Sequence, residues 1–178
     1  MNNKSKVFKS VRFLTTAAML TALSVVIGIV CKNFLNFGSG LFRVTFENLP
    51  IIMSGILLGP AAGGIVGAAS DLVSYLLSSQ IYPPNLIVTA GAVAVGVISG
   101  LIARFAVKER GKAQIIAAGG LAHLVGSMII KPIGLYQFYG ILVLWRIPLY
   151  LVIAPVEILL LCWLLNRPSI NRLFPKEN

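Results

Sequence analysis

The sequence predicts an all-α integral membrane protein, a single domain of six transmembrane helices, from three observations. Hydrophobic residues make up 57% of the 178 residues and charged residues 11%, against roughly 45–50% and about 25% in soluble domains. The mean hydropathy is +0.90, which is more apolar surface than one soluble core of this size can bury. The apolar residues fall in long runs. At about 20 residues for each span, the chain holds six spans and short tails at 1–10 and 167–178.

The first three spans are separated by polar or helix-breaking residues. A span at about 13–30 follows a basic N-terminal segment, and an apolar run at 49–58 is short for a bilayer. Gly59-Pro60 then ends that run, because proline fixes φ and has no backbone N–H for the helical ladder. A third span is expected at about 61–77, before a polar turn that contains two prolines.

The second half of the chain predicts three more spans, at about 86–107, 113–130 and 147–165. A strongly basic segment separates the fourth span from the fifth. An aromatic, glycine-containing stretch at 131–146 lies between the fifth span and the sixth. We expect this stretch to form a connection at the outer face of the membrane.

Basic residues set the expected orientation, because they collect in the cytoplasmic segments of membrane proteins. With six spans, the N-terminal segment, the 104–112 region and the C-terminal tail share one side, with eleven of the fifteen Lys and Arg residues. If 49–77 were one kinked helix, five spans would place the 104–112 region outside. We therefore expect six spans and both termini in the cytoplasm. The net charge of +10 then reflects topology, and no nucleic-acid partner is expected.

Ionisable residues inside the predicted spans indicate a polar cavity, since a charge in the hydrocarbon is costly unless it faces a partner or a cavity. Asp71 and Tyr75 share a face of the third span, and His123 and Lys131 share a face of the fifth. Glu157 lies on the sixth span, where we favour a structural role. A hydrogen bond between helices is the alternative for each of these groups.

Four basic residues depart from the cytoplasmic pattern and are expected at the outer face among aromatic side chains. An interfacial aromatic belt is one explanation. Guanidinium groups also bind carboxylates bidentately, and rings stack on rings, which suits an anionic ligand with an aromatic system. The four basic residues are Lys32, Arg43, Lys131 and Arg146. The candidate substrate-binding residues are Arg43, Asp71, Tyr75, Asn85, His123, Lys131, Tyr136, Tyr139 and Arg146.

Motifs for catalysis or metal binding are missing from the sequence. There is no G-x-x-x-x-G-K-[ST] loop for a nucleotide, and one histidine with two distant cysteines offers no zinc spacing. His123 and Ser127 share a helix face, but no G-x-S-x-G turn accompanies them. We therefore expect that the chain is not an enzyme, hydrolyses no ATP itself and holds no metal.

Small residues recur at four-residue spacing on several spans, where they let helix backbones approach closely in lipid. Ala18 and Ala22 share a face of the first span, and Gly96 and Gly100 share a face of the fourth. Glycines at 55, 59, 63 and 67 run through the second and third spans. Packing inside the helix bundle is expected for most of them.

Several segments resemble the substrate-binding S components of energy-coupling-factor vitamin transporters. The general S-component motifs are FRVTFENLP at 42–50, SGILLGP at 54–60 and GGIVGAASDL at 63–72. Three further segments are similar to the folate-specific branch: LLSSQIYPPN at 76–85, IIKPIGL at 129–135 and WRIP at 145–148. The likeness covers about residues 11–165.

The resemblance implies a six-helix protein of the bacterial plasma membrane that captures folate or a reduced folate at the outer face. It would dock on a membrane coupling subunit driven by two cytoplasmic ATPases, which use the ATP, so that the chain itself needs no cofactor. It would then topple to release the vitamin inside. The family's docking motif, A-x-x-x-A, falls on Ala18 and Ala22. The alternative ligand is another vitamin or precursor, such as pantothenate or a thiamine precursor, and the alternatives from other classes are a small intramembrane enzyme and a channel or scaffold subunit.

Overall fold

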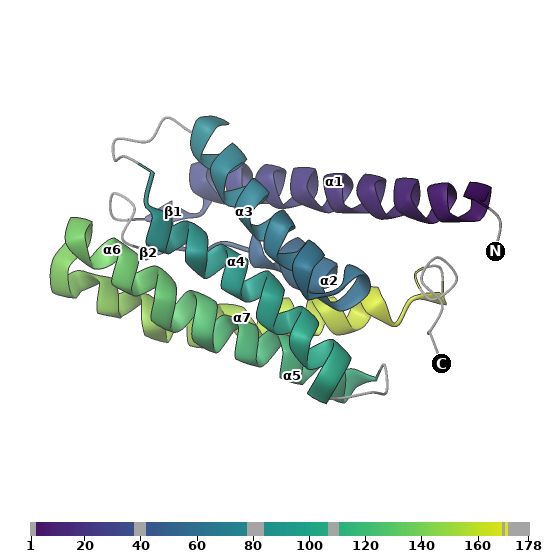
Figure 1. The fold of residues 1–178 in the computed structure, drawn as a ribbon. Coiled ribbons are helices and arrows are strands. Elements are labelled where there is room, and N and C mark those ends of the chain that lie inside the picture. Colours follow the sequence, from purple (N-terminus) through teal and green to yellow (C-terminus); the bar gives the residue numbers. More distant parts are fainter. Residues whose placement is uncertain (1–2, 38–41, 78–83, 107–110, 169, 171–178) are drawn as a thin grey trace.

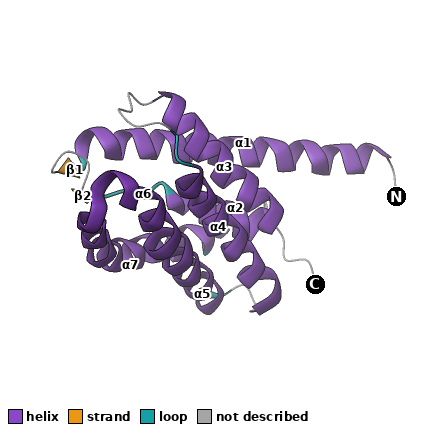
Figure 2. Cartoon of the chain, turned by 60° about the vertical axis from the view of Figure 1, so that its left-hand side comes forward, coloured by secondary structure: helices purple, strands orange, loops and turns teal. Residues whose placement is uncertain are grey.

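The computed structural model describes residues 3–37, 42–77, 84–106, 111–168 and 170. Most of them are helical (Figures 1 and 2). The α-helices are α1 (Asn3–Phe34), α2 (Asn48–Leu58), α3 (Pro60–Leu77), α4 (Leu86–Leu101), α5 (Lys112–Ala122), α6 (Lys131–Tyr139) and α7 (Arg146–Leu165). Two π-helices, η1 (Ile102–Ala106) and η2 (His123–Ile130), and the 3-10 helix η3 (Gly140–Trp145) extend them. A small antiparallel hairpin of β1 (Asn36–Phe37) and β2 (Phe42–Arg43) was not predicted.

Within the described residues, four helical segments are long and apolar enough to cross a membrane: Val11–Phe34, Pro60–Leu77, Leu86–Phe105 and Lys112–Leu165. α2 is apolar but shorter, as the run at 49–58 predicts. The last segment folds back on itself at Gly140, whose φ of +57° is accessible to glycine without steric cost. α7 therefore returns alongside α5 and η2, and it ends at the end of the bundle where α1 begins (Figure 1). The predicted helical fold of membrane type is confirmed.

The stretch at 131–146, expected to connect the fifth span to the sixth, is itself helical: α6 continues directly from η2, and η3 leads into α7. Pro132 lies in the first turn of α6. Gly134 packs against α4: a Cβ at this position would lie 3.0 Å from Ile87 Cβ and 3.1 Å from the Val88 nitrogen. The proline and the glycine that resemble turn signals thus belong to a helix that packs closely on its neighbour.

Close backbone contacts join α2, α3 and α4. A Cβ on Gly55 would lie 2.4 Å from the carbonyl oxygen of Gly96, and a Cβ on Gly63 would lie 2.3 Å from the same oxygen. A Cβ on Gly96 would lie 2.0 Å from the carbonyl oxygen of Gly63. These distances leave no room for a side chain, so the predicted packing role of these glycines is confirmed.

Gly96→Ala is expected to destabilise the bundle by at least about 1–3 kcal/mol, because the added methyl group meets backbone atoms that cannot rotate away. The melting temperature of the purified protein in detergent measures this loss. Gly120→Ala in α5 is the matched control, since a Cβ there meets nothing within 4 Å. Equal melting temperatures for the two variants would contradict the packing argument.

Candidate functional site

A polar pocket lies among α1, α2, α3, α4 and α6, toward the end of the bundle where α3 ends and α4 begins. Its cavity volume is about 10 Å³, room for about one water molecule. Its lining residues are Ser24, Glu47, Ile51, Ser70, Asp71, Ser74, Ala92 and Lys131. The fold thus brings together Asp71 and Lys131, two of the residues that the sequence suggested, from distant parts of the chain.

Asp71 contributes one wall of the pocket from the second half of α3. Its Oδ2 accepts a hydrogen bond of 2.6 Å from the Thr89 hydroxyl of α4, which orients the carboxylate. Its Oδ1 makes no hydrogen bond within the part of the chain that the structure describes. The neighbouring Ser70 hydroxyl is buried and lacks a hydrogen-bond partner among the described residues. The Ser70 hydroxyl is therefore a buried polar group at the pocket that is costly without a polar ligand or water.

Lys131 contributes the opposite wall from the first turn of α6, and only 5% of the residue is exposed. Its ammonium group lies 3.4 Å from Glu47 Oε1 and donates a hydrogen bond of 3.0 Å to Asn48 Oδ1. The Ser24 hydroxyl of α1 donates to the backbone carbonyl oxygen of Glu47 at 2.7 Å and so holds the Glu47 segment in place. A buried lysine is tolerated because its charge is paired and hydrogen-bonded.

His123 lies outside the pocket, deeper in the bundle. Its Nε2 is 2.7 Å from Glu157 Oε2 of α7, and both residues are almost fully buried. Its Nδ1 is 3.5 Å from the Ser127 hydroxyl, and the Tyr150 ring lies 6.5 Å from its ring. The structure therefore places His123 in a polar cluster behind the pocket and not in its lining.

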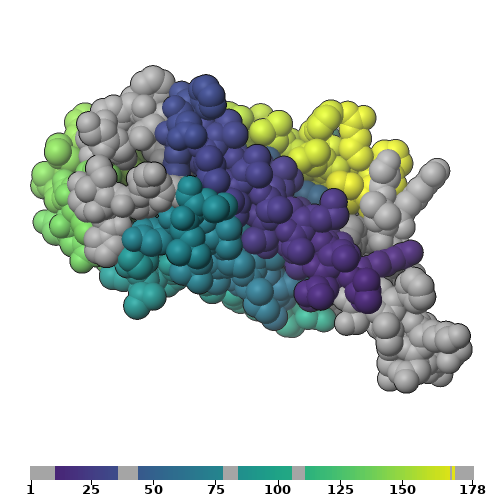
Figure 3. Space-filling view, turned by 90° about the horizontal axis from the view of Figure 1, so that it is seen from above, coloured from purple at the N-terminus to yellow at the C-terminus, as the bar shows by residue number. Residues whose placement is uncertain are grey.

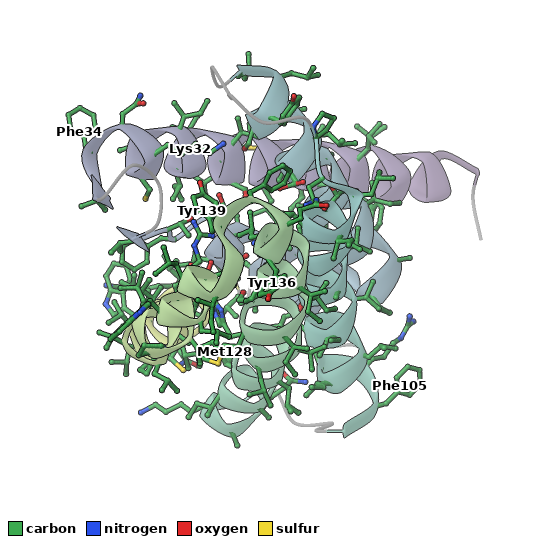
Figure 4. The ribbon with its side chains drawn as sticks, turned by 90° about the vertical axis from the view of Figure 1, so that its left-hand side faces the viewer. Lys32, Phe34, Phe105, Met128, Tyr136 and Tyr139 are labelled. Carbon is green, nitrogen blue, oxygen red and sulfur yellow. The ribbon has the colours of Figure 1, made fainter. Side chains whose placement is uncertain are left out.

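The end of the bundle above the pocket carries basic and aromatic side chains. Lys32 of α1 and Tyr136 and Tyr139 of α6 lie at this end (Figure 4). Lys32 donates a hydrogen bond of 3.4 Å to the Ser74 carbonyl oxygen, which ties α1 to α3. The Arg146 guanidinium lies 5.8 Å from the centre of the Tyr139 ring, a cation–π geometry.

The other suggested residues are placed as follows. Tyr75 is half-buried on α3, one turn beyond Asp71, and Tyr136 is 58% exposed. Asn85 caps α4 by accepting a hydrogen bond from the Ile87 N–H, and its amide donates to the Gly134 carbonyl oxygen of α6. Arg43 lies in β2, and its side chain is outside the described residues.

Sequence reasoning selected Asp71 and Lys131 and missed the other residues that line or support the pocket. Glu47 and Ser70 line the pocket and Thr89 orients Asp71. Glu47 is one of five acidic residues in a mostly apolar chain, and that rarity was a usable signal. Ser70 and Thr89 gave no sequence signal, because isolated hydroxyl residues are common in membrane helices and form hydrogen bonds readily with their own backbone.

Ala18 and Ala22 are exposed on α1. α1 runs along the surface of the bundle (purple to blue in Figure 3). Large apolar side chains beside the two alanines are exposed as well, including Leu14 at 69% and Met19 at 73%. The two alanines thus leave a shallow strip on an apolar helix face that the rest of the chain does not cover.

Comparisons with known proteins agree on one family. Residues 12–168 match the family described as "ECF transporter, substrate-specific component". A folate transporter, FolT, of Clostridium novyi (strain NT) is 35% identical over 79 residues, which are 43% of this chain and 46% of that protein. The matched part therefore spans about half the length of that relative.

Two solved structures share the fold. A crystal structure of FolT bound with folic acid superposes with a TM-score of 0.69 at 24% identity, over 87% of this chain and 93% of the other. The S component of a bacterial ECF transporter superposes with a TM-score of 0.65 at 24% identity, over 90% and 96%. Because the family match extends over nearly the whole helical bundle, this chain belongs to the substrate-specific S components of energy-coupling-factor transporters.

Proposed function

We propose that this S component binds folate or a reduced folate. The observation that carries the proposal is the pocket, where the Asp71 carboxylate, the Ser70 hydroxyl and the Lys131 ammonium group converge. The pterin ring of folate has amino and ring N–H donors beside a carbonyl oxygen and ring nitrogens. The pocket offers acceptors and donors that complement both sets. The likeness to folate transporters supports the same ligand.

The cavity has a volume of only about 10 Å³ in this structure, far below the roughly 300–1,000 Å³ of most ligand sites, so the lining side chains would move apart to admit the pterin ring. The rest of the vitamin would extend toward the end of the bundle that carries Arg43, Tyr136, Tyr139 and Arg146. We propose that the glutamate carboxylates of folate meet the basic groups there, because guanidinium and carboxylate pair bidentately.

The transport role proposed for the chain follows the family. Six spans with both termini in the cytoplasm of a bacterial cell would place the pocket toward the outer face. The start of α1 and the end of α7 lie at the same end of the bundle, which supports placing both termini on one side of the membrane (Figure 1). A membrane coupling subunit would dock on the strip formed by Ala18 and Ala22. Two cytoplasmic ATPases would supply the energy, so that the S component needs no cofactor of its own.

The ligand is tested by mass spectrometry of small molecules that copurify with the protein, followed by isothermal titration with folate. Pantothenate and a thiamine precursor are titrated in parallel, because they are the ligands of the alternative proposal. We expect saturable binding of folate and none of the other two. Tight binding of pantothenate or of the thiamine precursor would contradict the folate assignment.

Arg146→Ala is expected to weaken folate binding by roughly 10- to 150-fold, because a charge-assisted hydrogen bond contributes about 1.5–3 kcal/mol. Pteroate, which lacks the glutamate, should bind both proteins alike. Arg167→Ala is the matched control, since Arg167 also lies over an aromatic ring, 4.1 Å from the centre of Trp163 near the end of α7. An unchanged folate affinity in Arg146→Ala would overturn the carboxylate role.

A further inference from the structure

A row of five polar side chains leads from the pocket into the interior of the bundle. The Lys131 ammonium lies 3.0 Å from Asn48 Oδ1, and Asn48 Nδ2 lies 3.3 Å from the Ser127 hydroxyl. That hydroxyl is 3.5 Å from His123 Nδ1, and His123 Nε2 is 2.7 Å from Glu157 Oε2. Each residue of the row is at most 5% exposed, so water does not compete for these contacts.

The Lys131 end of the row assigns the direction of its first two hydrogen bonds, because an ammonium group only donates. Lys131 therefore donates to the Asn48 carbonyl oxygen, and the Asn48 amide donates to the Ser127 hydroxyl. The Ser127 hydroxyl in turn contacts His123 Nδ1 at 3.5 Å. Since the Asn48 amide does not take up or release protons near neutral pH, the row transmits position and not a proton.

Two features indicate that this row is more than packing. His123 and Ser127 lie in the π-helix η2, and π-helical turns are rare and are found frequently at functional sites. His123 Nε2 and both carboxyl oxygens of Glu157 are buried and make no hydrogen bond among the described residues, although Nε2 and Oε2 lie 2.7 Å apart. A buried ionic pair that is incompletely satisfied contributes little to stability, and apolar replacements are often as stable. Stability alone therefore does not account for these groups.

We propose that His123 and Glu157, acting through Ser127 and Asn48, are positioning residues that hold the Lys131 ammonium group at the wall of the ligand pocket. A lysine head group on a flexible four-carbon stem has many conformers. Glu47, another partner of Lys131, lies just before α2 and itself lines the pocket. Asn48 adds a second, buried anchor, so that the ammonium group faces the ligand in one geometry. This inference rests on the proposed function, because the ligand is taken to be folate.

A double-mutant cycle tests the row. Ser127→Ala removes its middle member and is expected to weaken folate binding by about 3- to 10-fold, whereas Lys131→Ala weakens it by about tenfold or more. In the Lys131→Ala background, Ser127→Ala should change the affinity by less than twofold, because the group it positions is gone. Losses that multiply in the double variant would overturn the proposal, since Ser127 would then act independently of Lys131.

Two further comparisons separate positioning from folding. Glu157→Gln keeps a polar side chain of the same size beside His123 and should bind folate within about threefold of the parent, whereas Glu157→Leu should match Ser127→Ala. Gln114→Leu is the matched control: Gln114 is a buried polar residue of α5 that donates to the Ala103 carbonyl oxygen, away from the row. It should leave the affinity unchanged. Equal affinities for Glu157→Leu and the parent would contradict the proposal.

A measurement without ligand keeps this inference distinct from the proposed function. NMR relaxation of the Lys131 side chain, in protein labelled at lysine, should show a lower order parameter in Ser127→Ala than in the parent. If the parent protein does not bind folate but Lys131 loses order in Ser127→Ala, the folate assignment is wrong and the positioning row stands. If folate binds and the order of Lys131 does not change, the row is refuted.

Discussion

Ala22→Trp is expected to abolish ATP-dependent uptake of the vitamin while the isolated subunit binds it normally. Ala18 and Ala22 are exposed on α1, so a bulky side chain at either position clashes with nothing inside the subunit. Close approach of a partner helix in lipid depends on small residues, and an indole ring would hold the backbones apart. Uptake into vesicles that contain the coupling subunit and both ATPases measures the loss, and a pulldown shows whether the complex forms.

Leu159→Trp on α7 is the control for this prediction, because Leu159 is 70% exposed and lies on a different helix. It should retain uptake. If Ala18→Trp and Ala22→Trp both transport normally, the docking strip is elsewhere. If they lose ligand binding together with complex formation, the two alanines pack within the subunit, in conflict with their exposure.

Asp71→Ala is expected to weaken folate binding by roughly 100-fold or more. The carboxylate is oriented by the Thr89 hydroxyl and lines the pocket beside Ser70, where it would accept two hydrogen bonds from the amino and ring N–H groups of the pterin. Two charge-assisted bonds at about 1.5–3 kcal/mol each account for a loss of this size. Isothermal titration of folate into the variant measures it.

A ligand analogue distinguishes recognition from a general disturbance of the pocket. Folate without its 2-amino group should bind the parent protein weakly, because a site built for that group is left with an unpaired carboxylate. The same analogue and folate should bind Asp71→Ala with similar affinity. Thr89→Val, which removes the orienting hydroxyl and keeps the carboxylate, should show a smaller loss. If Asp71→Asn binds folate as tightly as the parent protein does, the role of Asp71 is structural.

The stretch at 131–146 shows that local residue types do not always determine the secondary structure of a connecting segment. Its lysine, proline, glycine and aromatic residues specified a connection between two spans without specifying its form, and the structure forms α6 and η3. A neighbouring helix contributes to this, because Gly134 lets α4 approach to distances tighter than most Cβ contacts. A turn signal and a packing glycine are the same residue type, and only the facing helix distinguishes them.

Lys131 shows the same limit at the site. Its departure from the cytoplasmic pattern of basic residues marked it as a candidate for binding a carboxylate at the outer face. The structure buries it beside Glu47 and Asn48, which come from a segment more than 80 positions earlier in the chain. Asp71 was identified correctly as a group that faces a polar cavity, because a charge within an apolar helix has few other reasons to exist.

The sequence by itself determined the class of this protein. Long apolar runs and a scarcity of charge specify membrane helices, because the number of residues needed to cross the hydrocarbon is a property of each segment alone. The spacing of glycine and alanine residues along each helix likewise specifies where another helix can pack closely. The composition of the pocket was decided only by the tertiary structure. Ser24, Glu47, Ser70 and Lys131 become neighbours when five helices converge, and no periodicity within one helix records which residues of another helix will face it. The partners of a buried charge are chosen by contacts between distant segments, since a charge in a low-dielectric interior is stable only beside groups that the whole fold brings to it.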